Sequence, residues 1–196
     1  MTTTTLRDLN GFDQAPAVLA NSTLILIDYQ NTYTQGVMEL DGWKEALDAA
    51  ADLLARARAA GTKVIHVVND GGEGTPYDIR AEIGRIHPKV APIEGEPTVV
   101  KGKPNAFLDT ELDRLVDEAG NNKVIIAGFM THMCVAFTAQ GAFLRGNHVT
   151  VVADASATRP LRTEAGEVTA EQLHRGALAT VHDLYGVVVA EGSQLV

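Results

Sequence analysis

The stretch VIIAGFMTHMCVAF, residues 124–137, holds the single cysteine of the chain and decides the fold. It begins as a short apolar run, which is typical of a strand buried on both faces. It then passes through Gly128 and Thr131 into a helical pattern that contains Cys134. The stretch therefore predicts a strand–turn–helix unit of a parallel sheet, with a thiol in the first turn of the helix.

The same alternation of short β-branched runs and longer helical patterns extends outward in both directions. Strands are predicted at residues 22–28, 62–70, 97–102, 122–128, 148–154 and 187–190, and helices at 42–61, 109–120, 131–146 and 169–186. Asp109 or Thr110 is the expected N-cap of the second helix, and Thr169 with Gln172 forms a capping box for the last. The alternation predicts an α/β fold: one three-layer, Rossmann-like domain over residues 1–196, with a mostly parallel six-stranded sheet between helices. A polar arm at residues 1–21 leads into it.

Composition narrows the class of protein. The chain of 196 residues is 45% hydrophobic and carries a formal net charge of -9. An acidic chain without clustered Lys and Arg is not expected to bind nucleic acid. No apolar run approaches the roughly 20 residues that span a bilayer, the N-terminus does not resemble a secretory signal, and one cysteine cannot form an intrachain disulfide. We expect a cytoplasmic protein that binds a small-molecule substrate and neither nucleic acid nor membrane.

Three polar residues stand where predicted strands end. Asp28 closes the apolar run LILID, Lys101 follows the run TVV, and Cys134 follows the strand at 122–128. Ligands of parallel sheets bind beyond the carboxyl ends of the strands, so the three side chains are expected to meet. Helix N-terminal N–H groups and a nearby cation lower the pKa of a thiol, and Asp28 would accept its proton. Each residue also has a structural interpretation, because a lone cysteine is commonly a buried apolar residue and most lysines are surface residues.

The histidines and glycines are weaker candidates. His66 lies within an apolar strand and is expected in the core, and His87 is expected to anchor a loop. His132 stays open as a partner of Cys134, although residues two apart on a helix do not share a face. The Gly-rich loop DGGEGTPYD matches neither phosphate-binding motif, and no zinc signature is present, so no cofactor and no metal are expected.

These strand-end residues resemble the isochorismatase-like cysteine hydrolases, a family that includes nicotinamidases and N-carbamoylsarcosine amidases. The resemblance rests on LILIDYQN, VVKGKPNAFLDTEL, VIIAGFMTHMCVAFTAQGA and VTVVADASATR, which extend from Ser22 to beyond Arg159. Asp, Lys and Cys appear in the family's order. The match is specific for the family and weak for the substrate.

The resemblance implies a catalytic triad of Asp28, Lys101 and Cys134, with Lys101 preferred to Lys103 because of its place before NAF. It also implies a cis peptide bond between Phe129 and Met130, and an oxyanion hole formed by the backbone N–H groups of Met130 and Cys134. Substrate-pocket residues are expected near the triad in sequence: Tyr33, Phe107, Thr131 and His132. By analogy with the family, a homo-oligomer, either dimer or tetramer, is expected.

The expected activity is hydrolysis of a non-peptide C–N bond in a small amide through a cysteine thioester. The segment NDGGEGTPYDIR lacks the metal motif of family nicotinamidases, so metal-assisted nicotinamide hydrolysis is not expected. Two alternatives stay open. One is an isochorismatase-type vinyl-ether hydrolase with Asp28 as the acid. The other is a redox-sensing or binding scaffold that uses Cys134, although no second cysteine is present to resolve an oxidised thiol.

Overall fold

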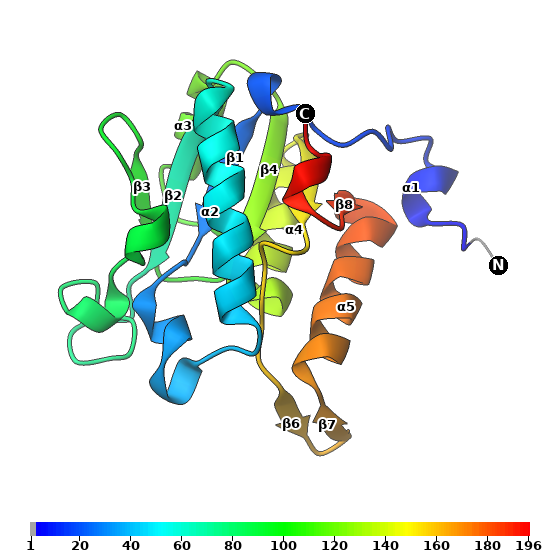
Figure 1. Cartoon of the computed structure of the whole chain (residues 1–196). Helices are drawn as coiled ribbons and strands as arrows, with labels where there is room; N and C mark the ends of the chain where they lie inside the picture. The colour runs from blue at the N-terminus through cyan, green and yellow to red at the C-terminus, as the bar shows by residue number, and fades with distance from the viewer. Residues whose placement is uncertain (1–2) are drawn as a thin grey trace.

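A parallel sheet of six strands forms the middle layer of the protein, for which a computed structural model describes residues 3–196 (Figure 1). Across the sheet the strands are β3 (Thr98–Lys101), β2 (Lys63–Asn69), β1 (Thr23–Ile27), β4 (Lys123–Gly128), β5 (His148–Val152) and β8 (Val187–Val189). Every neighbouring pair in this sheet is parallel. The predicted three-layer α/β fold is confirmed.

Helices cover both faces of the sheet. On one face lies α2 (Trp43–Ala59), and on the other lie α3 (Leu112–Glu118), α4 (Ala136–Leu144) and α5 (Ala170–Thr180). Alternate side chains of β1 divide between the two cores, Leu24 and Leu26 packing toward α2 and Ile25 and Ile27 toward the other helices. Because both faces of the strand are buried, its sequence is apolar throughout rather than alternating.

The N-terminal segment is packed more closely than a polar arm would be. It carries the short helix α1 (Leu6–Leu9), and the guanidinium of Arg7 is buried and donates to the carbonyls of Asp13 and Leu184. A two-stranded antiparallel hairpin, β6 (Leu161–Thr163) and β7 (Gly166–Val168), was not predicted and extends beyond one end of the sheet (Figure 1). Single 3₁₀ turns occupy Leu19–Asn21, Asn31–Thr34, Gly36–Met38, Glu82–Gly84, Pro88–Val90 and Gly192–Gln194.

Several predicted helix boundaries are wrong. The helix α3 begins at Leu112 rather than at residue 109, because Asp109 adopts a left-handed φ of 58°, and its N-cap residue is Glu111. The Thr110 hydroxyl donates to the carbonyl of Ala106 and accepts a 3.2 Å hydrogen bond from the N–H of Leu112. The helix α4 begins at Ala136, after a π-helical turn, η6 (Thr131–Val135), and α5 ends in a second such turn, η7 (Val181–Tyr185). The capping box of Thr169 and Gln172 is confirmed.

The order of strands reverses between β1 and β4, since β2 and β3 lie to one side and β5 and β8 to the other. Such a switch point opens a crevice at the carboxyl ends of the two strands. In this sheet Ile27 is in register with Gly128, so Asp28 and Phe129 follow side by side. A Cβ on Gly128 would lie 2.1 Å from the carbonyl oxygen of Ile27, so only glycine allows the two strands to approach this closely here.

Candidate active site

Asp28, Lys101 and Cys134 converge at the switch point. The Lys101 ammonium lies 2.7 Å from Asp28 Oδ2 and 3.2 Å from the Cys134 thiol. The Lys101 and Asp28 side chains are fully shielded from solvent, and Cys134 is 7% exposed. Three strand ends that are distant in sequence thus bring an acid, a cation and a thiol into one water-excluded cluster, where electrostatic interactions are strong.

The backbone at Asp28 directs its side chain into this cluster. Asp28 follows β1 in a left-handed conformation with φ of 53°, which is uncommon for a residue with a side chain. Its N–H donates to the carbonyl of Val67, which holds this conformation against β2. Neither carboxylate oxygen accepts a hydrogen bond of ordinary geometry from residues 3–196, although Lys101 is within ion-pair distance. Asp28 therefore retains the capacity to accept a proton or a hydrogen bond.

The protonation states correct one expectation from the sequence. Burial, together with the neighbouring Asp28 carboxylate, raises the pKa of Cys134 to about 12, and Lys101 offsets only part of this effect. The thiol is therefore protonated at neutral pH, whereas its place near a helix N-terminus predicted a lowered pKa. The sequence argument missed the cost of removing a thiolate from water and the repulsion by a second anion.

The shifts in the pKa values of Asp28 and Lys101 favour an ion pair between these two side chains. Burial raises the pKa of the Asp28 carboxyl, while attraction by Lys101 opposes that rise. Burial acts to lower the pKa of Lys101, but the negative charge of Asp28, followed by Cys134, outweighs it and the pKa is raised. The resting cluster is best described as an ammonium–carboxylate pair beside a neutral thiol.

The turn before Cys134 has an unusual backbone. The peptide bond between Phe129 and Met130 is cis. The N–H of Met130 has no hydrogen-bond acceptor among residues 3–196, whereas Thr131 N–H donates to the carbonyl of Ala157 at 3.0 Å. A free backbone donor thus lies four residues before the thiol, at the mouth of the turn η6.

Two tyrosines lie near enough to the cluster to feel its charges. Tyr33 is buried, and its ring contacts those of Phe129 and Tyr77 edge-on, at centroid distances of 5.7 and 5.8 Å. Burial and the nearby Asp28 raise the pKa of Tyr33, so its hydroxyl stays neutral. Tyr77 comes from the loop of residues 70–85, and the sequence reasoning missed it. The Gly-rich composition of that loop drew attention to the loop but gave no reason to choose this residue.

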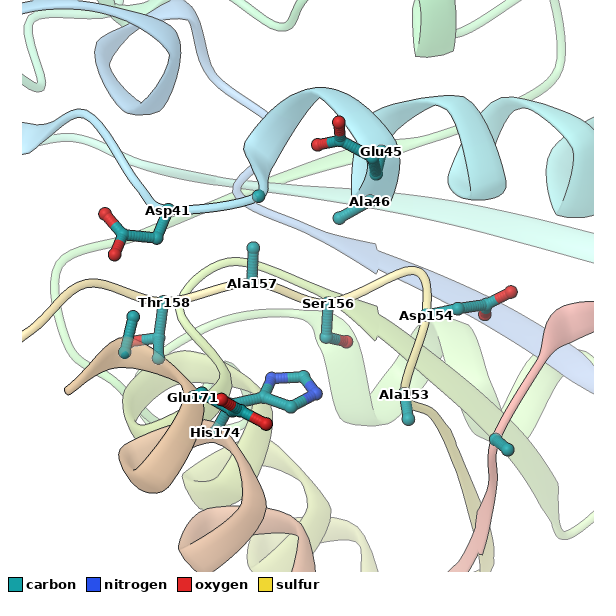
Figure 2. A pocket seen from close by; sticks show the side chains of 13 residues that line it. Asp41, Glu45, Ala46, Ala153, Asp154, Ser156, Ala157, Thr158, Glu171 and His174 are labelled. Atoms are coloured by element: carbon teal, nitrogen blue, oxygen red, sulfur yellow. The ribbon is translucent and has the colours of Figure 1, made fainter.

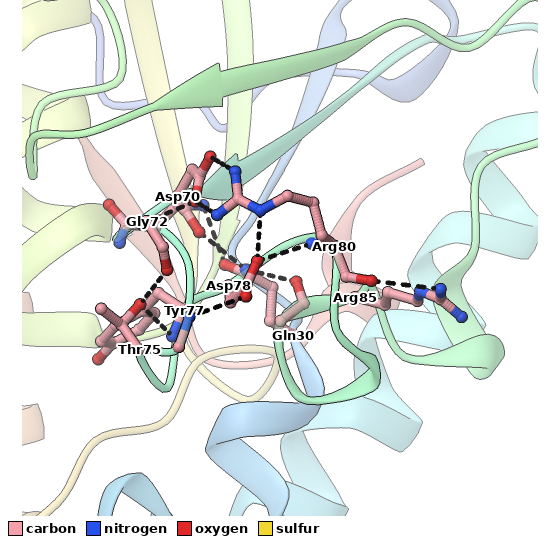
Figure 3. A network of polar contacts seen from close by, with 11 residues as sticks. Gln30, Asp70, Gly72, Thr75, Tyr77, Asp78, Arg80 and Arg85 are labelled. Atoms are coloured by element: carbon pink, nitrogen blue, oxygen red, sulfur yellow. Dashed lines mark hydrogen bonds and ion pairs between the residues drawn. The ribbon is translucent and has the colours of Figure 1, made fainter.

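A network of polar contacts holds that loop in place (Figure 3). At its base, the buried Gln30 amide donates to the carbonyls of Asn69 and Gly84, which tie together the two ends of the loop. Within it, Arg80 pairs with Asp78 at 2.7 Å and with Asp70 at 3.2 Å. Asn69 also accepts a 3.4 Å hydrogen bond from Lys101, so the base of the loop contacts the cluster itself.

Arg159 is a second residue that the sequence reasoning did not select. It follows Thr158, whose hydroxyl bonds His132 Nδ1 at 2.6 Å. Its Nε is buried without a hydrogen-bond partner among residues 3–196. Burial raises the pKa of Tyr77, and the positive charge of Arg159 opposes part of that rise. Burial lowers the pKa of His132, and Arg159 adds to that effect. Arg159 therefore has a guanidinium N–H that is free to bind a ligand, and it lies near Tyr77 of the loop at residues 70–85. In the sequence, its position in VTVVADASATR, beyond a strand end, was the one feature that could have identified it.

Other residues considered from the sequence, Phe107 and Thr131 of the expected pocket together with His66 and Lys103, contact side chains outside the triad. Phe107 packs beneath the guanidinium of Arg145, 5.4 Å away, near the far end of α4. Thr131 is buried, and its hydroxyl bonds His174 of α5 at 2.9 Å. His66 lies in the core and bonds Glu96. Lys103 points to solvent and pairs with Asp109.

A separate acidic cleft of about 570 Å³ lies at the carboxyl ends of β5 and β8 (Figure 2). The segment of residues 153–158 forms part of its wall, and the triad does not line it. Its lining residues are Asp41, Gly42, Glu45, Ala46, Ala153, Asp154, Ser156, Ala157, Thr158, Ala170, Glu171, His174 and Ala190.

Within the described residues, no three His, Cys, Asp or Glu side chains converge as a metal site would require. No helix over the same range has the length and apolarity needed to cross a membrane.

Comparisons with known proteins identify the family of this fold. The family model of the isochorismatase domain matches residues 22–191. A secreted isochorismatase effector of Verticillium dahliae is 31% identical over 185 residues, covering 94% of this chain and 95% of the effector. A streptothricin hydrolase of Streptomyces noursei is 34% identical, with 78% and 60% covered, and a maleamate amidohydrolase of Pseudomonas putida is 31% identical, with 72% of each covered.

Among solved structures, the crystal structure of an isochorismatase from Pseudomonas putida KT2440 superposes with a TM-score of 0.96. It is 37% identical and covers 100% of both chains. The fold, the residues matched by the family model and these relatives lead to one conclusion: the chain belongs to the isochorismatase family of hydrolases.

Proposed function

We propose that this protein hydrolyses a C–N bond of a small amide through a thioester on Cys134. The observation that carries the proposal is the buried Lys101 ammonium, which contacts both Asp28, at 2.7 Å, and the thiol, at 3.2 Å. An amidase needs a nucleophile, a group that moves protons and a charge that fixes both, and these three side chains supply them. Relatives named for amide hydrolysis support this reaction class.

The raised pKa of the thiol determines the order of the steps. Because a resting thiolate is disfavoured, the Cys134 proton passes to Asp28 as the sulfur attacks the substrate carbonyl carbon. Lys101 stabilises the negative charge while it moves from oxygen to sulfur. The carbonyl π electrons move to oxygen, which the N–H groups of Met130 and Cys134 stabilise as an oxyanion hole.

Collapse of this intermediate breaks the C–N bond, and Asp28 transfers its proton to the leaving nitrogen. The thioester is then attacked by water, whose proton Asp28 accepts. Cleavage of the C–S bond releases the carboxylic acid, and the proton on Asp28 returns to sulfur. The Asp28 oxygens accept no hydrogen bond of ordinary geometry among residues 3–196, which suits a group that gains and loses a proton twice in each cycle.

Arg159 favours an amide that also carries an anion. Its buried Nε has no partner among the described residues, and a guanidinium binds a carboxylate through two parallel hydrogen bonds. A substrate carboxylate bound at Arg159 would orient the amide carbonyl toward Cys134. Substrates without a carboxylate would lack this contact and would bind more weakly. The relative named for maleamate, itself an amide with a carboxylate, is consistent with this substrate class.

A second candidate is vinyl-ether hydrolysis of the isochorismatase type, which the name of the Verticillium dahliae relative favours. Here Asp28, with its pKa raised by burial, would act as the acid, and Cys134 would not react. A redox-sensing role has less support, because oxidants react with a thiolate and the pKa of this thiol is about 12.

The test is a substrate panel assayed with the wild type and with Cys134→Ala. It contains primary amides, N-carbamoyl compounds and lactams, each with and without a carboxylate, together with isochorismate. We expect turnover of a carboxylated amide, its loss in Cys134→Ala, and a thioester adduct on Cys134 in intact-mass spectra after acid quenching. Isochorismate turnover that persists in Cys134→Ala, with no amide hydrolysed by the wild type, would replace this proposal with the second candidate.

A further inference from the structure

The turn η6 that carries Cys134 is fixed from outside by α5. The Oγ1 of Thr131 and Nδ1 of His174 are 2.9 Å apart. Within residues 3–196, this is the one side-chain hydrogen bond that joins α5 to the turn. The two residues are 43 positions apart in sequence, so nothing local requires them to meet.

Thr131 occupies a sensitive place in the proposed site. It lies between Met130, whose N–H has no acceptor among the described residues, and Cys134. Its side chain is 1% exposed, and its backbone N–H is already used by the carbonyl of Ala157. The hydroxyl is therefore the remaining group through which a distant element can set the orientation of this residue.

His174 is suited to hold that hydroxyl. Burial, with a smaller contribution from the adjacent Arg175, lowers the pKa of His174, so the imidazole is neutral at pH 7. A neutral ring has one nitrogen that donates and one that accepts, and the Thr131 hydroxyl can complement Nδ1 in either role. Figure 2 shows His174 rising from α5 into the acidic cleft, below the segment of residues 156–158. That segment also holds the turn, through Ala157.

We propose that His174 is a positioning residue for the reaction: its hydrogen bond to Thr131 fixes the turn that presents Cys134 and the two oxyanion N–H groups. The inference rests on the proposed amidase function. Among residues 3–196, no hydrogen bond or ion pair joins His174 to the three triad side chains. It acts through Thr131, and a small displacement of a catalytic turn is enough to lower a rate strongly.

The experiment compares His174→Ala, His174→Asn and Thr131→Val with the wild type, using the amide that the wild type hydrolyses best. We expect His174→Ala to lower kcat about tenfold or more while KM changes less than about twofold. His174→Asn should recover most of kcat, because its amide places a polar atom where Nδ1 stands. His182→Ala is the matched control, since that histidine is exposed on the neighbouring turn and should leave kcat unchanged.

A double-mutant cycle separates positioning from general damage to the fold. If His174 acts through Thr131, then adding His174→Ala to Thr131→Val causes no further loss of kcat. Independent losses that multiply would overturn the inference, and so would equal rates for His174→Ala and His174→Asn. Thermal unfolding of each variant is measured alongside; should His174→Ala unfold at the assay temperature, the Asn and Val variants decide the question.

Alkylation of Cys134 by iodoacetamide provides a readout that needs no substrate. We expect His174→Ala to change the alkylation rate constant at pH 8 by at least about threefold, with His174→Asn and His182→Ala close to the wild type. A wild type that hydrolyses no amide would refute the proposed function alone, and this comparison would still judge His174. Identical alkylation rates in all four proteins would count against the inference.

Discussion

Lys101 and Lys103 are two residues apart, and each pairs with an aspartate, yet the two pairs behave differently. Lys101 and Asp28 lie 2.7 Å apart with neither side chain exposed. Lys103 and Asp109 are as close, but their side chains are 53% and 71% exposed. Water screens the second pair, so it contributes little, whereas the first combines a large desolvation cost with a strong attraction. The comparison indicates that burial, rather than the distance between the charges, distinguishes the two pairs.

A buried pair of this kind is weak evidence for stability. Apolar residues of similar volume often replace such pairs without loss of stability, whereas removal of one partner alone is costly. In the proposed mechanism its value lies in reactivity, because Asp28 exchanges protons with Cys134 in low-dielectric surroundings.

Lys101→Met should abolish amide hydrolysis and lower the free energy of unfolding by about 3–5 kcal/mol at pH 7. Without its cation, Asp28 is a buried carboxylate with a folded-state pKa far above that of the unfolded chain. Such a group lowers stability progressively as pH rises above its unfolded pKa, so the deficit should be smaller at pH 5 than at pH 8. Urea unfolding of both proteins at the two pH values measures this; a deficit that grows on acidification would contradict it.

Asp28→Asn should separate thiol reactivity from catalysis. Loss of the carboxylate removes one of the causes that raise the pKa of Cys134 and leaves Lys101 beside the sulfur. At pH 7.5 we expect alkylation of Cys134 about tenfold faster than in the wild type, which corresponds to one pKa unit, while amide hydrolysis is lost. In the wild type the alkylation rate should keep rising with pH through pH 9. Slower alkylation of Cys134 in Asp28→Asn than in the wild type would show that Asp28 activates the sulfur in the resting enzyme.

Arg159→Gln examines a cation without a partner among the described residues. It should raise KM for carboxylated amides about tenfold or more, because a hydrogen bond to a charged group is lost. Neutral amides of the same size provide the control and should change little. Equal changes for both classes of amide would indicate that Arg159 supports the fold of the site and does not select the substrate.

Lys103→Met should have the smallest effect. Because the pair with Asp109 is exposed to solvent, we expect kcat/KM within about twofold of the wild type and an unchanged unfolding midpoint in urea. This variant is the matched control for Lys101→Met, since the substitution is the same and the two sites are neighbours on the chain. A large loss of activity would place Lys103 in the site and reverse the comparison.

Much of the architecture could be predicted because it depends on local pattern. Continuous apolar runs identified the strands, and the capping box of Thr169 and Gln172 marked the start of α5. Helix starts were less accurate: the left-handed Asp109 and the π-helical turn at Thr131–Val135 are set by contacts with other segments. Local propensity carries little information about such contacts.

By itself, the sequence determined the parallel α/β fold and placed Asp28, Lys101 and Cys134 at the ends of strands, because hydrophobic periodicity and strand order are properties of the chain. Only the tertiary structure decided that the thiol is protonated, with a pKa of about 12, and that Tyr77, Arg159 and His174 lie around the site or hold its turn. The physical reason is that a pKa depends on desolvation and on neighbouring charges. Both are set by segments far apart in sequence, which come together only when the chain folds.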